Sequence, residues 1–62
     1  MDELRYRLLT EVIKVLGFEH KNTIAFAKIV SNRKNSLHTC EVAKKAIIEL
    51  YLEELVEEQL ED

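Results

Sequence analysis

The stretch LHTCEVAKKAIIELYLEELVEEQLE, residues 37–61, decides the fold of this chain. Neither glycine nor proline interrupts it, and its apolar residues recur at spacings of three and four. Both features are typical of an α-helix. We therefore predict one long helix over 37–61, which at 1.5 Å per residue would span roughly 37 Å.

The apolar side chains of this helix change direction part-way along it. At about 100° per residue, the first half places one group on a single side: Cys40, Val42, Ala43, Ala46, Ile47, Leu50 and Tyr51. The second half places another group on roughly the opposite side: Ile48, Leu52, Leu55 and Val56. Either two other helices sandwich this one from different sides, or a second chain covers the second group. We favour the second chain, because small domains rarely expose such an apolar patch without use.

A homodimer is the assembly that the second group predicts. The predicted dimer or partner interface consists of Ile48, Tyr51, Leu52, Leu55 and Val56. Residues 46–62 carry seven acidic side chains and no basic one, so two parallel helices would place like charges side by side. We therefore expect an antiparallel pair, in which the acidic end of one helix approaches Lys44 and Lys45 of the other.

Two shorter helices are expected before the long one, over 2–16 and 23–32. Gly17 is the only glycine and stands where a helix-ending residue takes a left-handed backbone. Asn22 is a favourable N-cap for the second helix. Arg5 falls within the apolar arc of the first helix, where we expect its side chain to reach out to solvent. The apolar residues of the second helix spread around its whole circumference, which predicts a mostly buried element.

Length and composition favour one small all-α domain, residues 1–62. A single cysteine excludes an internal disulfide, and a hydrophobic fraction of 47% excludes a disordered tail. Chains of this size commonly gain stability from a metal, disulfides or a second chain. We predict a three-helix domain with a long C-terminal helix, which assembles as a dimeric helical bundle.

The basic middle of the chain supports an alternative function. Residues 21–45 carry a net charge of +5 within a chain of net charge −3. Phe26 and Ala27 match part of the helix-turn-helix pattern, whereas Asn32 stands where an apolar residue is usual. In this interpretation the basic segment 28–45 would bind phosphates and base edges. The candidate contacts are Arg33, Lys34, Asn35, Ser36, His38, Thr39 and Lys44.

Catalytic, metal and cofactor sites are not expected. His38 and Cys40 stand two residues apart on a predicted helix, so their side chains point apart. Together with His20 they offer three soft ligands, too few for a closed structural metal site. One glycine cannot build a phosphate-binding loop. We predict that the protein is not an enzyme and has no cofactor, metal or small-molecule substrate.

The apolar stretch near the N-terminus predicts neither a signal peptide nor a membrane span. Glu11 and Lys14 interrupt it, and acidic residues precede it. We therefore expect a cytoplasmic protein without a membrane partner. The function predicted is a small protein-binding regulator or adaptor that binds itself and another protein, and the alternative is a helix-turn-helix DNA-binding transcriptional regulator.

Overall fold

The computed structural model describes residues 3–60, and these form three α-helices. The helices are α1 (Glu3–Leu16), α2 (Lys21–Ser31) and α3 (Leu37–Leu60). No strand occurs within the described residues. The predicted all-α class, with a long C-terminal helix, is confirmed. Residues 2 and 61, which we expected inside the first and third helices, lie outside the described part.

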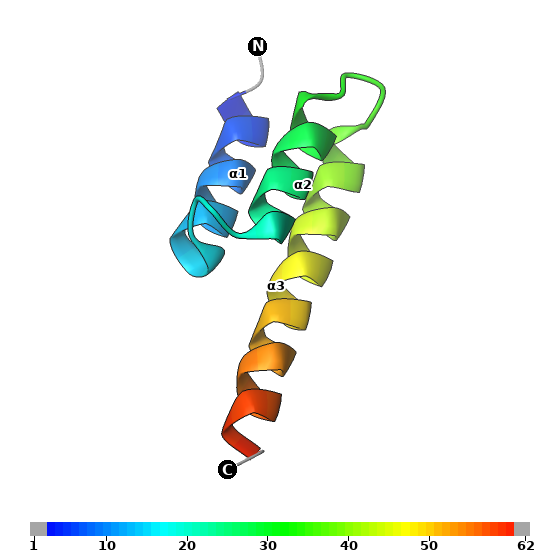
Figure 1. Ribbon diagram of the computed structural model, residues 1–62. Coiled ribbons are helices and arrows are strands. Elements are labelled where there is room, and N and C mark those ends of the chain that lie inside the picture. Colours follow the sequence, from blue (N-terminus) through cyan, green and yellow to red (C-terminus); the bar gives the residue numbers. More distant parts are fainter. Residues whose placement is uncertain (1–2, 61–62) are drawn as a thin grey trace.

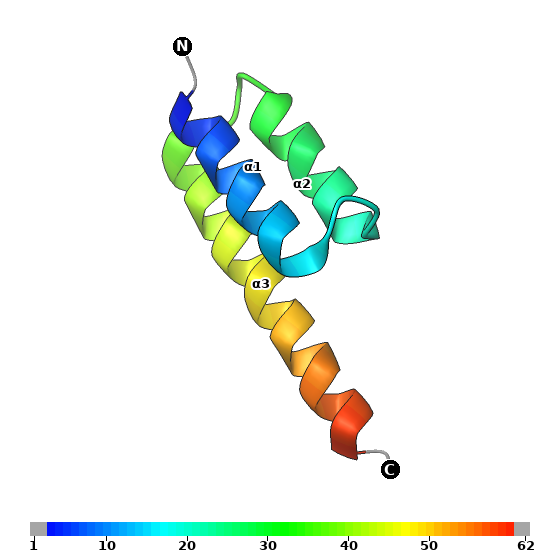
Figure 2. The same cartoon turned by 90° about the vertical axis from the view of Figure 1, so that its left-hand side faces the viewer.

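The first two helices form a hairpin that lies against only the N-terminal half of α3. Figures 1 and 2 both show α1 and α2 side by side along this half, while the rest of α3 continues past them. The molecule measures 46 × 19 × 14 Å, and its radius of gyration is 12.5 Å. A compact chain of 62 residues would have a radius of gyration of about 10.6 Å. The projecting half of α3 accounts for the elongated shape.

One small core holds the three helices together. Its buried apolar members are Val12, Phe26, Val30 and Cys40. Half-buried side chains from all three helices pack around them, namely Leu8, Leu9, Leu16, Ile29, Ala43 and Ile47. Phe26 is the largest fully buried side chain, so it contributes the most apolar area to the centre of the hairpin.

Gly17 ends α1 with a left-handed backbone, as predicted. Its φ is 96°, and its N–H donates to the Ile13 carbonyl oxygen at 2.8 Å. A Cβ built at this position would meet no atom within 4 Å. The glycine is therefore needed for its backbone conformation and not for space.

Gly17→Ala is expected to lower the free energy of unfolding by about 1 kcal/mol, because an L-residue is strained at this φ. Urea unfolding followed by circular dichroism would measure the loss. Gly17→Asn is the comparison, because asparagine tolerates left-handed backbone better than alanine does. An unfolding midpoint that alanine leaves unchanged would contradict this account of the turn.

The second helix begins at Lys21, two residues earlier than predicted. His20 is its N-cap: the His20 Nδ1 accepts a hydrogen bond from the Asn22 N–H at 3.0 Å. The His20 carbonyl oxygen also accepts from Thr23 N–H at 3.0 Å and from Ile24 N–H at 3.2 Å. The prediction that Asn22 is the N-cap is therefore wrong, because a histidine ring nitrogen supplies the acceptor that a helix start requires.

The prediction that the second helix is mostly buried is also wrong. Its buried residues are Thr23, Phe26 and Val30, which are spaced i, i+3, i+7 and form one stripe. Ile24 is 51% exposed, and Ala25 is exposed as well. The physical reason is that, among the described residues, only those of α1 and α3 pack on α2, and together they cover one side of it.

Candidate functional site

The first half of α3 buries a narrower face than its sequence predicts. Cys40 is fully buried, and Ala43 and Ile47 pack against the core. By contrast, Val42 and Leu50 are 55% and 53% exposed. At about 100° per residue, Val42 points away from the core residues, whereas Leu50 stands on nearly the same side as Ala43 but seven residues further along. The prediction placed all seven apolar residues of this half on one side of the helix. The structure buries some of them in the core and leaves others exposed to solvent.

The second apolar group of α3 lies where the hairpin no longer covers the helix. Leu52, Leu55 and Val56 are 50%, 38% and 54% exposed, whereas Ile48 is half-buried. Every described residue after Tyr51 is exposed. The alternative in which two helices sandwich α3 is therefore wrong for residues 52–60. We call Ile48, Leu52, Leu55 and Val56 the α3 ridge.

Tyr51 marks the end of the hairpin's contact with α3. Its ring meets the ring of His20 edge to face, with centroids 5.5 Å apart and planes at 86°. Below this contact, Leu52 and Val56 line a shallow apolar depression, together with Glu53 and Glu57. The ridge thus offers an apolar surface flanked by carboxylates. Within residues 3–60, no other helix covers its lower part, which consists of Leu52, Leu55 and Val56.

Several residues of the basic segment hold the fold together. The Asn35 side-chain amide donates to the Ile29 carbonyl oxygen at 3.0 Å. Ser36 caps α3, because its Oγ accepts from Thr39 N–H at 3.1 Å and its carbonyl oxygen accepts from Cys40 N–H at 3.1 Å. The Ser36 and Thr39 hydroxyls are 3.1 Å apart and hydrogen-bonded. These three candidates for nucleic-acid contact therefore carry structural hydrogen bonds.

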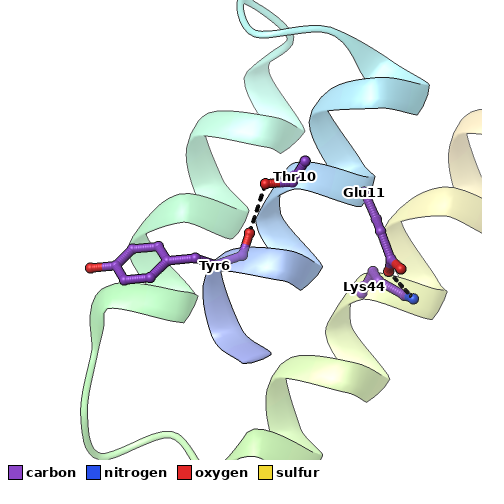
Figure 3. Close-up of polar contacts among 4 residues, drawn as sticks. All are labelled: Tyr6, Thr10, Glu11 and Lys44. Carbon is purple, nitrogen blue, oxygen red and sulfur yellow. Dashed lines mark hydrogen bonds and ion pairs between the residues drawn. The ribbon is translucent and has the colours of Figure 1, made fainter. Parts of the chain in front are cut away.

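Lys44 pairs with a carboxylate of its own chain. Figure 3 shows Lys44 of α3 reaching across to Glu11 of α1, with a distance of 2.6 Å between Lys44 Nζ and Glu11 Oε2. The hydrogen bond and positive charge of Lys44 lower the pKa of Glu11. This pair ties α1 to α3. A phosphate or a partner's acidic helix end would have to compete with Glu11 for Lys44.

The three remaining candidates for nucleic-acid contact lie on the surface. Arg33, Lys34 and His38 are all exposed. However, α2 and α3 run side by side in opposite directions in both views (Figures 1 and 2). A DNA-binding helix-turn-helix joins its two helices at about 90–120°. The local charge agrees with nucleic-acid binding, whereas the arrangement of the two helices departs from the motif.

Arg5 ties the start of α1 to the turn between α2 and α3. Its guanidinium donates to the carbonyl oxygens of Val30 at 3.2 Å, of Asn32 at 3.3 Å, and of Asn35. Its Nη1 also lies 3.9 Å from the Cys40 Sγ. The expectation that Arg5 reaches out to solvent is therefore wrong. Carbonyl groups at the end of α2 and in the turn lack helix partners, and the five-donor guanidinium supplies donors to them.

Arg5→Ala is expected to lower the free energy of unfolding by about 2 kcal/mol, because it removes charge-assisted hydrogen bonds from partly buried carbonyl groups. Chemical unfolding of the purified protein would measure the loss. Arg7→Ala is the matched control, since Arg7 is an exposed arginine of the same helix, and it should change stability by less than about 0.5 kcal/mol. Equal losses for the two variants would show that the turn does not depend on Arg5.

The structure does not bring His38 and Cys40 together as a catalytic pair. His38 is exposed and Cys40 is buried in the core. Within residues 3–60, no group of three or more histidine, cysteine or acidic side chains is placed to hold a metal ion. No helix in this part of the chain is both long and apolar enough to cross a membrane.

Comparisons with family models, with curated proteins and with solved structures find no match to this chain. The apolar surface that the fold leaves uncovered is therefore the feature that bears on function.

Proposed function

We propose that this protein is a small cytosolic regulator or adaptor that binds proteins and acts through a homodimeric helical bundle. The observation that carries the proposal is the α3 ridge, whose lower part is apolar and not covered by the chain's own helices. A helix end that is apolar on one side and extends beyond its domain is well suited to pack on another helix.

A second partner is part of the proposal, because apolar side chains are also exposed away from α3. Phe18, between α1 and α2, is 74% exposed, and Tyr6 on α1 is 61% exposed. Aromatic side chains of this kind are enriched where proteins contact each other. A dimer formed through α3 would leave Tyr6, near the start of α1, available for a different protein, as an adaptor requires.

Sedimentation equilibrium of the wild-type protein across the micromolar range tests the assembly. We expect a single mass of two chains, which declines toward one chain on dilution. A single-chain mass throughout that range would contradict the homodimer, and with it the mechanism proposed for the adaptor.

DNA binding is our alternative proposal, and the exposed Arg33 and Lys34 support it. If it holds, Lys34→Ala should weaken binding to a DNA duplex and reduce the salt dependence by about one phosphate contact. Fluorescence anisotropy with a labelled duplex would measure both effects. Lys14→Ala, an exposed lysine outside the basic segment, is the control. If the wild type binds no duplex below about 50 mM salt, where nonspecific attraction is strong, the alternative fails.

A further inference from the structure

We infer that the α3 ridge is covered by the same ridge of a second copy, with the two helices antiparallel and related by a two-fold axis near residues 53 and 54. This inference rests on the proposed homodimer and adds to it the orientation and register of the contact. Three independent features support it: the exposed area of the chain, the spacing of its apolar residues, and the distribution of its charges.

The chain exposes more surface than a monomer of its size normally does. Its accessible surface is 4934 Å², whereas a folded monomer of this mass exposes about 4,200 Å². The excess is roughly 700 Å², close to the ~800 Å² that each partner buries in a protein–protein interface of standard size. The projecting half of α3 is the part that departs from a compact shape (Figures 1 and 2). One copy of the chain thus exposes enough extra area to form half of a stable interface.

The apolar spacing of α3 favours a helix of the same sequence as the occupant. Ile48, Leu52, Leu55 and Gln59 follow the alternating four- and three-residue steps of a coiled-coil seam. In an antiparallel pair, Leu52 packs against the partner's Leu55, and Leu55 packs against the partner's Leu52. The outer layers then pair Ile48 with the partner's Gln59, and Gln59 with the partner's Ile48. Leucines meet leucines at the centre, and the polar Gln59 lies at the two ends of the seam.

The charges favour the antiparallel orientation. In this register the partner's Glu58 lies beside Tyr51, where the hairpin reaches α3 through His20. His20 is flanked in the sequence by the exposed Glu19 and Lys21, whose charges cancel, so the acidic helix end of the partner meets a hairpin end without net charge. A parallel pair would instead bring the acidic ends of both helices together, and like charges at an interface are unfavourable.

Cysteine cross-linking distinguishes the two orientations. Ile48→Cys and Gln59→Cys are prepared separately, mixed, and oxidised with glutathione. In the antiparallel register these positions face each other between chains. In an antiparallel dimer of one variant, the two cysteines are eleven residues apart along the helices, which is about 16 Å. A disulfide requires the two Cα atoms to be within ~7 Å, so these cysteines cannot form one. We therefore expect a covalent dimer from the mixture and none from either variant alone.

Two controls accompany this experiment. The native Cys40 is fully buried, so the wild type should not cross-link. Leu50→Cys mixed with Gln59→Cys tests a position on the opposite side of α3 and should also remain uncross-linked. Mass spectrometry of the intact protein without reductant gives the mass of each product, and peptide mapping identifies the bridged positions.

Each result decides the question. A bridge from the mixture only, between positions 48 and 59, supports the antiparallel register. Cross-linking of either variant with itself shows a parallel pair and overturns the inference. The absence of any bridge, together with a two-chain mass in sedimentation, overturns the register but leaves the homodimer standing. A single-chain mass overturns both the inference and the homodimer on which it rests.

Discussion

Leu52→Glu is expected to convert the dimer into a monomer at micromolar concentration. In the proposed dimer, Leu52 lies at the centre of the seam, so the substitution places one carboxylate in the interface from each chain. Burying an unpaired charge costs roughly 3–5 kcal/mol, and 3 kcal/mol already corresponds to a more than hundredfold rise in Kd. Sedimentation equilibrium at matched concentrations would measure the change.

Leu50→Glu provides a closely matched control for this prediction. Leu50 is 53% exposed and Leu52 is 50% exposed, and both stand on α3 two residues apart. The two substitutions change charge, volume and helix propensity equally, but Leu50 lies on the side of the helix away from the ridge. We expect Leu50→Glu to remain dimeric. If both variants dissociate, the effect is one of net charge, and if both remain dimeric, the ridge is not the interface.

Phe26→Ala is expected to unfold a large fraction of the protein. Phe26 is fully buried and is the largest side chain of the core. Replacing a buried phenylalanine by alanine costs about 3–5 kcal/mol, and a domain of 62 residues has only about 3–9 kcal/mol of stability in total. Thermal unfolding followed by circular dichroism would measure the loss. The comparison requires one fixed protein concentration, because dimerisation makes apparent stability depend on concentration.

Ile24→Ala is the control for the core variant. Ile24 lies two residues before Phe26 on α2, yet it is 51% exposed, so its truncation should cost well under half as much. Similar losses at both positions would contradict the one-sided burial of α2. A loss below about 1 kcal/mol for Phe26→Ala would show that the core is organised differently.

The elements that depend on local interactions could be predicted from the order of the residues alone. The long helix from Leu37 follows from a stretch without glycine or proline in which apolar residues recur at spacings of three and four. The positive φ of Gly17 follows from a glycine placed after the last periodic residue of the first helix. Ser36 lay close to the expected start of that helix, and its hydroxyl does cap it. These features involve atoms only a few residues apart, so residue type and spacing were sufficient to predict them.

Which sides of these helices are covered depends on how distant segments pack together. Arg5 contacts carbonyl groups 25 to 30 residues away, and Lys44 pairs with Glu11 across 33 residues. No local pattern predicts such partners. The exposure of Leu52 likewise depends on where α1 and α2 end beside α3. The apolar spacing of the α3 ridge would be the same if longer α1 and α2 helices covered it. The spacing of apolar residues predicts that one face of a helix is apolar. Whether the chain covers that face with its own residues depends on contacts between segments far apart in the sequence.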